Sequence, residues 1–274
     1  ERGIVFYPTL SDQHSILFQQ IIPVRLREAL YALDALLQHD TELDPRMNIS
    51  DMHGATELIM AAGKMLGFEL CPRLRGINRM KLYRFADSRV RGRLKRVLKG
   101  EIDEEVIRKN YDAVVRVIAS MKIRLVAPSL ILHRLGTYAA DHPLHQAMAE
   151  IGRVLKTIYV LKYATHPKFR REVEYDMDKN ESSHTLTRNI FFGKFGESRL
   201  RDLEDQANSF SCLALLQNVV IRWTMRAMEK TIRAMEAEGQ TVPIELLSRI
   251  YPTRFSHIRR YGRFRIDVER MKNR

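Results

Sequence analysis

At 274 residues, with 45% hydrophobic and 29% charged side chains, the chain is long enough to bury a sizeable core, which excludes a mainly disordered protein. It contains no uncharged apolar run of about 18 residues, which excludes a membrane-spanning helix. The formal net charge of +13 makes a polyanion the leading candidate for a partner. The chain begins at Glu1 without an initiator methionine or a signal-peptide pattern, so we expect a segment of a longer polypeptide.

Strand and helix signals alternate over the first part of the chain. The predicted elements are, in order, a strand over residues 4–7, a helix over 26–37, a strand over 47–50, a helix over 58–66 and a strand over 68–71. Asp51 could cap the second helix, and Gly67 would end it. This order predicts α/β layering with at least part of the sheet parallel.

After Arg73 the strand signals disappear and helical periodicity takes over. Asp103 could cap a helix through residue 118, and further helices are predicted over residues 128–135, 143–163 and 203–238. The last of these has apolar side chains at helical spacing, which we interpret as core. They are Phe210, Leu213, Leu216, Val220 and Trp223. The pattern predicts a helical insertion between the sheet and a helix around Glu181.

The cysteines and histidines give weak signals. Cys71 and Cys212 lie far apart in apolar surroundings, which favours reduced core thiols over a disulfide or a zinc site. His142 and His145 flank Pro143, which is more typical of a helix start than of a metal site.

Positive charge is concentrated in two segments. Residues 73–99 hold eleven basic side chains against Asp87 alone, and residues 249–274 have a net charge of +7. The basic residues of the first segment are Arg73, Arg75, Arg79, Lys81, Arg84, Arg89, Arg91, Arg93, Lys95, Arg96 and Lys99. Clustered positive charge of this kind favours binding to nucleic acid, through release of the counterions held by phosphates. A solvated face or a site for an acidic protein is the alternative.

Two acidic residues stand out as candidate metal ligands. Asp51 follows a predicted strand, within Ser50-Asp51-Met52-His53-Gly54, and Glu181 lies in a predicted helix. That helix would place His184, Thr185 and Arg188 on the same face as Glu181. The arrangement predicts a metal-dependent nuclease core. Asp51 could instead be a helix cap, Glu181 an exposed helix residue, and His53 a side chain bonded to the backbone.

Several motifs, taken together, resemble one protein family over nearly the whole chain. They are Glu28-Ala29-Leu30-Tyr31-Ala32-Leu33-Asp34, Asp51-Met52-His53-Gly54-Ala55-Thr56-Glu57, Leu66-Gly67-Phe68 with Pro72-Arg73-Leu74-Arg75, Glu150-Ile151-Gly152-Arg153 with Lys156-Thr157, the Glu181 motif, Arg201-Asp202-Leu203-Glu204-Asp205-Gln206-Ala207-Asn208, and His257-Ile258 with Tyr261-Gly262. In their order and density the chain resembles the TnpA transposases of replicative class II transposons of the Tn-three type, specifically the C-terminal part of the DDE catalytic region.

The resemblance implies a DDE polynucleotidyl transferase on a ribonuclease-H-like α/β fold. It implies a mixed sheet with a large helical insertion and C-terminal helices: residues 1–75 for the first part of the core, 76–170 for the insertion and 171–274 for the remainder with the Glu181 helix. Asp51 and Glu181 would be catalytic residues and ligands of two Mg²⁺ ions, with Mn²⁺ as a substitute. The first aspartate would belong to a strand upstream, with Asp12 only a capping residue, so the isolated chain is expected to be inactive.

The resemblance also implies supporting roles and partners. Lys179, His184 and Arg188 would position the scissile phosphate or the carboxylates, with His53 also in support. The partner would be double-stranded DNA, both transposon ends and target, with a homodimer in the full-length enzyme, no membrane, and a bacterial, nucleoid-associated location in the cytoplasm. The alternatives are a non-catalytic DNA-binding or scaffold module of a transposase-derived protein, and a helical protein-interaction domain.

Overall fold

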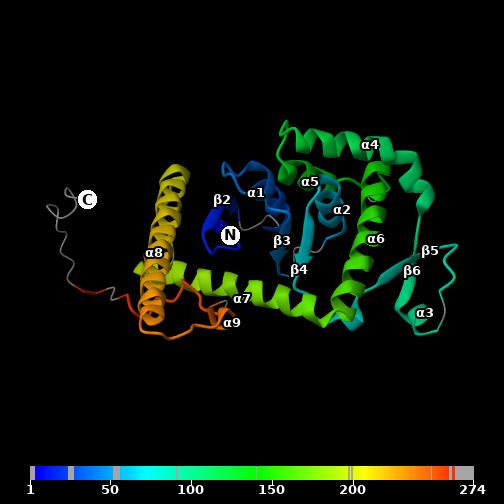
Figure 1. Cartoon of the computed structure of the whole chain (residues 1–274). Helices are drawn as coiled ribbons and strands as arrows, with labels where there is room; N and C mark the ends of the chain where they lie inside the picture. The colour runs from blue at the N-terminus through cyan, green and yellow to red at the C-terminus, as the bar shows by residue number, and fades with distance from the viewer. Residues whose placement is uncertain are drawn as a thin grey trace. The chain divides into compact units, whose positions relative to one another are not determined.

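The computed structural model describes residues 4–23, 28–51, 56–90, 92–139, 141–196, 198, 200–247, 249–258 and 261–262. The chain is divided by its contacts into two compact units, Glu1–Asn180 and Glu181–Arg274. The protein is mixed α/β, mainly helical, with small sheets (Figure 1). None of the helices within the described ranges has the length and hydropathy of a membrane span.

Unit 1 begins with an antiparallel hairpin of β1 (Ile4–Leu10) and β2 (Ile16–Pro23). In the turn, the Ser11 backbone N–H donates to the Ser15 carbonyl at 2.8 Å. The strand predicted over residues 4–7 is confirmed, but β2 was not predicted. Its apolar residues are interrupted by the adjacent Gln19 and Gln20, which hide the strand period.

The strand predicted over residues 47–50, the helix over 58–66 and the strand over 68–71 are confirmed. They are β3 (Met47–Ser50), α2 (Glu57–Leu66) and β4 (Glu69–Pro72), and the two strands pair in parallel. Gly67 ends α2 at φ 99°, a left-handed conformation that favours glycine. The prediction that Asp51 caps α2 is wrong, because the N-cap is Thr56, whose side chain accepts a hydrogen bond from the Ile59 N–H.

The prediction that strands disappear after Arg73 is also wrong. β5 (Leu82–Phe85) and β6 (Leu98–Ile102) form a second parallel pair, preceded by η3 (Ile77–Arg79) and joined through α3 (Arg93–Val97). Each strand buries few side chains and carries charge, as at Arg84 and Glu101. A short strand with so few buried apolar positions gives no clear alternation in the sequence.

Further helices of unit 1 contribute to a hydrophobic core that they share with α2 and β4. They are η1 (Glu28–Tyr31), α1 (Ala32–Gln38), α4 (Glu104–Lys122), α5 (Pro128–Gly136) and α6 (Pro143–Thr165). Asp103 caps α4 as predicted, by accepting from the Val106 N–H at 3.1 Å. The helices predicted to start at Pro128 and Pro143 are confirmed, with His142 at the N-cap of α6.

Helix α6 packs against α2, α4 and β5 (Figure 1) and fixes their positions by specific contacts. Gly152 lies against the backbone of Glu57, at the first turn of α2, where a Cβ atom would be 1.9 Å from the carbonyl oxygen. One turn further on, Lys156 Nζ donates to Glu57 Oε1 at 2.8 Å. Although partial burial opposes ionisation, this bond holds the pKa of Glu57 below its usual value.

Two more contacts connect α6 to the strands. The Thr157 hydroxyl oxygen accepts the Tyr83 N–H of β5 at 3.1 Å, and the Tyr159 hydroxyl donates to the carbonyl of Pro72, the last residue of β4, at 2.7 Å. The motif residues Gly152, Lys156 and Thr157 therefore form a packing surface.

Unit 2 contains residues 181–190 of α7 (Pro167–Ile190), η4 (Gly193–Gly196), α8 (Leu203–Ala237) and α9 (Ile244–Leu247). The predicted helix over residues 203–238 is confirmed. Phe210 and Leu213 are buried as predicted, but Leu216 and Trp223 are exposed, and so is Cys212. α8 has apolar residues on more than one face, so its pattern does not identify the buried one.

Candidate active site

Asp51 follows the last residue of β3 and is exposed. Because β3 and β4 are parallel, with Ser50 opposite Pro72, both strands end at the same edge. The Arg73 N–H donates to the Ser50 carbonyl at 2.7 Å, so an acidic and a basic residue follow the two strand ends. The carboxyl ends of parallel strands are where α/β proteins place their ligand sites.

The carboxylate of Asp51 acts electrostatically on the hairpin formed by β1 and β2. Tyr7 of β1 is buried, and burial together with the carboxylates of Glu28 and Asp51 raises its pKa to about 12. Both carboxylates therefore act on the same phenol group. Glu28 was recognised in the sequence only as part of a family motif, and an isolated acid before an apolar helix gives no further signal of proximity to Asp51.

Glu181 lies on α7, as the helical prediction required, and its side chain is exposed. His184, Thr185 and Arg188 are exposed as well, whereas Ser183, Leu186 and Asn189 are buried. This spacing of three and four residues gives the helix one covered and one open face. The predicted common face of Glu181, His184, Thr185 and Arg188 is therefore present within unit 2.

A buried glutamine on α8 determines which face of α7 is covered. Gln217 is fully buried, its Nε2 donates to Ser183 Oγ at 2.6 Å, and its Oε1 accepts from Thr187 Oγ1 at 2.5 Å. Rotation of α7 would leave these buried polar groups unpaired, at a cost of about 1–3 kcal/mol for each group. Gln217 thus holds the open face of α7 outward, a role that the sequence analysis did not identify.

The imidazole of His184 is affected by its helix neighbours. Loss of hydration and the nearby Arg188 guanidinium lower its pKa, while the Glu181 carboxylate acts in the opposite direction. The neutral imidazole is therefore favoured, which leaves one ring nitrogen able to accept a proton or a hydrogen bond.

The remaining predicted supporting residues are placed differently. Lys179, in unit 1, forms an ion pair with Asp176 at 2.8 Å and lies 4.8 Å from the centroid of the Tyr175 ring. It is therefore held by its own helix. His53 lies outside the described residues.

The basic segment presents several cations to solvent. Its exposed members include Arg75, Arg79, Lys81, Lys95 and Arg96. Arg73 and Arg84 are half-buried, and Arg84 pairs with Glu101 across β5 and β6. Arg91 lies outside the described residues, and Arg93 begins α3.

Carboxylate oxygens are the hard donors that Mg²⁺ prefers, so the donor chemistry of Asp51 and Glu181 fits a divalent ion. Within the described ranges there is no group of three or more His, Cys, Asp or Glu side chains arranged to hold a metal. The ligand set for such an ion therefore stays a prediction.

An exposed aspartate at the carboxyl end of parallel strands, an exposed glutamate with its neighbouring histidine and arginine, and a basic segment are together typical of proteins that process nucleic acids with metal ions. Residues 1–264 match the Tn3 transposase DDE domain, and the chain belongs to this family. The resemblance found in the sequence motifs is confirmed.

Curated relatives that are similar to this chain over most of its length are named as transposases. The chain is 32% identical to the transposase for transposon Tn1546 of Enterococcus faecium over 270 residues, which cover 98% of the chain and 27% of the relative. It is 31% identical to the transposase for transposon Tn21 of Escherichia coli over 95% of the chain and 26% of the relative. It is 29% identical to the transposase for transposon gamma-delta of Escherichia coli strain K12, over 96% of the chain and 26% of the relative. The chain therefore spans about a quarter of these relatives' length.

Proposed function

We propose that the chain is the catalytic segment of a DNA transposase, which cleaves DNA at transposon ends and joins the strands to target DNA in replicative transposition. The observation that carries the proposal is the match of residues 1–264 to a transposase DDE domain. The parallel pair β3 and β4 would then belong to a ribonuclease-H-like core.

Asp51 and Glu181 are proposed as catalytic residues that hold two divalent ions, Mg²⁺ or, as a substitute, Mn²⁺. Bound ions of this kind stabilise the charge on the attacking and leaving oxygens of an in-line displacement at phosphorus. The exposure of both carboxylates supports this assignment, because substrate phosphate and water must complete the ion's ligands. These are two of the three acids of a DDE set, so the 274-residue chain alone is expected not to cleave DNA.

His184 and Arg188 are proposed to position the scissile phosphate. They share the open face of α7 with Glu181, and Arg188 offers a planar set of donors that matches two phosphate oxygens. Lys179 and His53 are proposed in support, with the ion pair between Lys179 and Asp176 holding that side chain before DNA binds.

The exposed arginines and lysines of residues 73–99 are proposed to contact the backbone of double-stranded DNA, both transposon ends and target. Each phosphate contact adds to the salt dependence of binding. A homodimer of the full-length transposase would bring two transposon ends together, at the nucleoid of a bacterial cell.

The test is metal-dependent strand cleavage by a full-length transposase that contains this chain. Asp51→Asn and Glu181→Gln should each abolish cleavage in Mg²⁺ and in Mn²⁺, while binding of duplex end DNA is largely kept. A matched control is Asp44→Asn, because Asp44 is exposed and pairs with the neighbouring Arg46. Cleavage retained in either acid variant would refute the catalytic assignment of that residue, whereas no metal-dependent cleavage by the unsubstituted full-length protein would favour a DNA-binding scaffold.

A further inference from the structure

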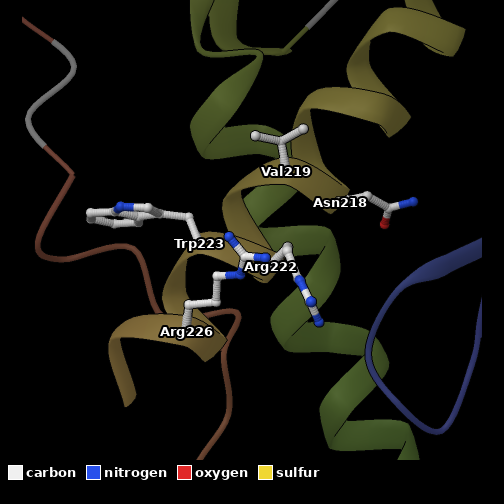
Figure 2. Close-up of a pocket in the computed structure, with 5 residues that line it drawn as sticks. All are labelled: Asn218, Val219, Arg222, Trp223 and Arg226. Atoms are coloured by element: carbon white, nitrogen blue, oxygen red, sulfur yellow. The ribbon is translucent and has the colours of Figure 1, made fainter. Parts of the chain in front are cut away.

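α8 carries a shallow hollow of about 400 Å³. Figure 2 shows the lining side chains projecting from successive turns of the helix. They are Asn218, Val219, Arg222, Trp223 and Arg226. The hollow therefore combines apolar surface with two cations.

Trp223 is the chain's single tryptophan, and 57% of its surface is exposed. Its neighbours Ile221 and Thr224 are buried, so the rotation of α8 turns the indole outward. The ring stacks on His257 with centroids 5.4 Å apart and planes inclined by 29°. Because this stacking leaves more than half of the residue in contact with water, the indole retains apolar surface that a planar ligand can cover.

The charge beside the indole is positive. Arg222 and Arg226 are exposed and one turn apart, and neither forms an ion pair or hydrogen bond within the described part of the chain. About two turns further along α8, by contrast, Arg233 is paired with Glu229 at 2.5 Å. The two guanidinium groups next to Trp223 are therefore available to an anion.

An exposed aromatic ring beside unpaired arginines matches the chemistry of single-stranded nucleic acid. Bases stack on aromatic side chains while cations hold the backbone phosphates, largely without regard to sequence. Bases in an intact duplex are already stacked on one another, so only an unpaired base can present its face to the indole. An acidic protein segment could satisfy the arginines but would leave the flat apolar surface of the indole without a matching partner.

We propose that Trp223, Arg222 and Arg226 form a binding site for single-stranded DNA, in which an unpaired base stacks on the indole and its flanking phosphates contact the arginines. The proposal rests on the proposed function, because cutting and joining single strands of a duplex produces unpaired ends and gaps. It adds a subsite for those unpaired nucleotides on α8.

Because Trp223 is the chain's single tryptophan, its fluorescence reports directly on this site. The 274-residue chain is titrated with a single-stranded oligonucleotide, with an abasic strand of the same length and charge, and with the corresponding duplex. The single strand should quench the emission at much lower concentration than the other two. Equal quenching by the abasic strand would show a backbone effect only and overturn base stacking.

Variants are compared through the anisotropy of a labelled single strand. Trp223→Ala should weaken binding about 5- to 150-fold, the equivalent of one lost stacking interaction, while Trp223→Phe keeps most of it. Arg222→Gln with Arg226→Gln should reduce the slope of log affinity against log salt by about 1.4, whereas the paired Arg233→Gln should leave it nearly unchanged. All these side chains are exposed, and unchanged circular dichroism would verify the fold.

Unchanged affinity of Trp223→Ala for the single strand would overturn the proposal. If metal-dependent cleavage by the full-length transposase still requires Asp51 and Glu181 in that case, the proposed function stands and only this site is lost. If the single strand binds through Trp223 but cleavage does not depend on those acids, the site stands and the catalytic assignment is lost.

Discussion

Gly152→Ala should destabilise unit 1 by pushing α6 away from the first turn of α2. The added Cβ would lie 1.9 Å from the Glu57 carbonyl oxygen and 2.4 Å from its carbonyl carbon. Both are backbone atoms, so no side-chain rotation can relieve the overlap. Overpacking costs about 1–3 kcal/mol, and a backbone obstruction belongs at the upper end. Alanine also gains about 1 kcal/mol of helix propensity over glycine, which leaves a net loss of about 2 kcal/mol in the free energy of unfolding.

Two other helical glycines provide matched controls. A Cβ at Gly136 meets nothing within 4 Å, so Gly136→Ala should stabilise the chain by up to about 1 kcal/mol. A Cβ at Gly63 would be 2.6 Å from Leu70 Cδ1, a side-chain atom that can move, so Gly63→Ala should fall between the other two. Urea unfolding followed by circular dichroism measures all three. Equal unfolding midpoints for Gly152→Ala and Gly136→Ala would refute the argued contact between α6 and α2.

Three further predictions concern single side chains. Gln217→Met should lower the free energy of unfolding by about 1–3 kcal/mol, because it leaves the buried Ser183 hydroxyl without its hydrogen-bond donor. Urea titration measures the change, and an unchanged free energy of unfolding would contradict the described packing of α7 on α8. The pKa of His184 in the folded chain is lowered from 6.5. As the pH falls below 6.5, the unfolded chain therefore takes up a proton before the folded chain does. The contribution of His184 to stability is present above pH 6.5 and is lost as the pH falls through the folded pKa. His184→Gln should therefore weaken the acid dependence of the unfolding midpoint, and an identical pH profile would contradict this. Burial raises the pKa of the Cys71 thiol to about 12, whereas Cys212 is exposed. A thiol reagent at pH 8 should therefore label Cys212 rapidly and Cys71 slowly. Cys212→Ser should remove the rapid phase of labelling.

Prediction from the sequence worked best where the spacing of apolar residues and the residues that end a helix indicated the same element. β3, α2 and β4 were found because a buried apolar run was followed by Gly67, whose left-handed conformation ends α2. α4 was found from the cap at Asp103. β5 and β6 were missed because a short strand with few buried residues shows no clear alternation of apolar and polar residues in the sequence.

At the candidate site, the shared face of Glu181 and His184 followed from helical spacing alone. The role of Gln217 did not, although its position four residues before buried Ile221 places it on the covered stripe of α8, a signal that could have identified it. Trp223 was placed in the core because large apolar residues usually are buried, and only the packing of its neighbours shows that it faces outward.

The contacts of α6 also bear on how relatives of this chain are recognised. Gly152, Lys156 and Thr157 belong to one of the motifs on which the resemblance to the family rests, yet in the structure they hold α2 and β5 in place. A search based on this motif would therefore find chains that share a helix-packing geometry, whether or not they keep an acid at the positions of Asp51 and Glu181. Loss of catalysis during evolution would leave such a signature intact, so family membership and chemical competence have to be tested separately.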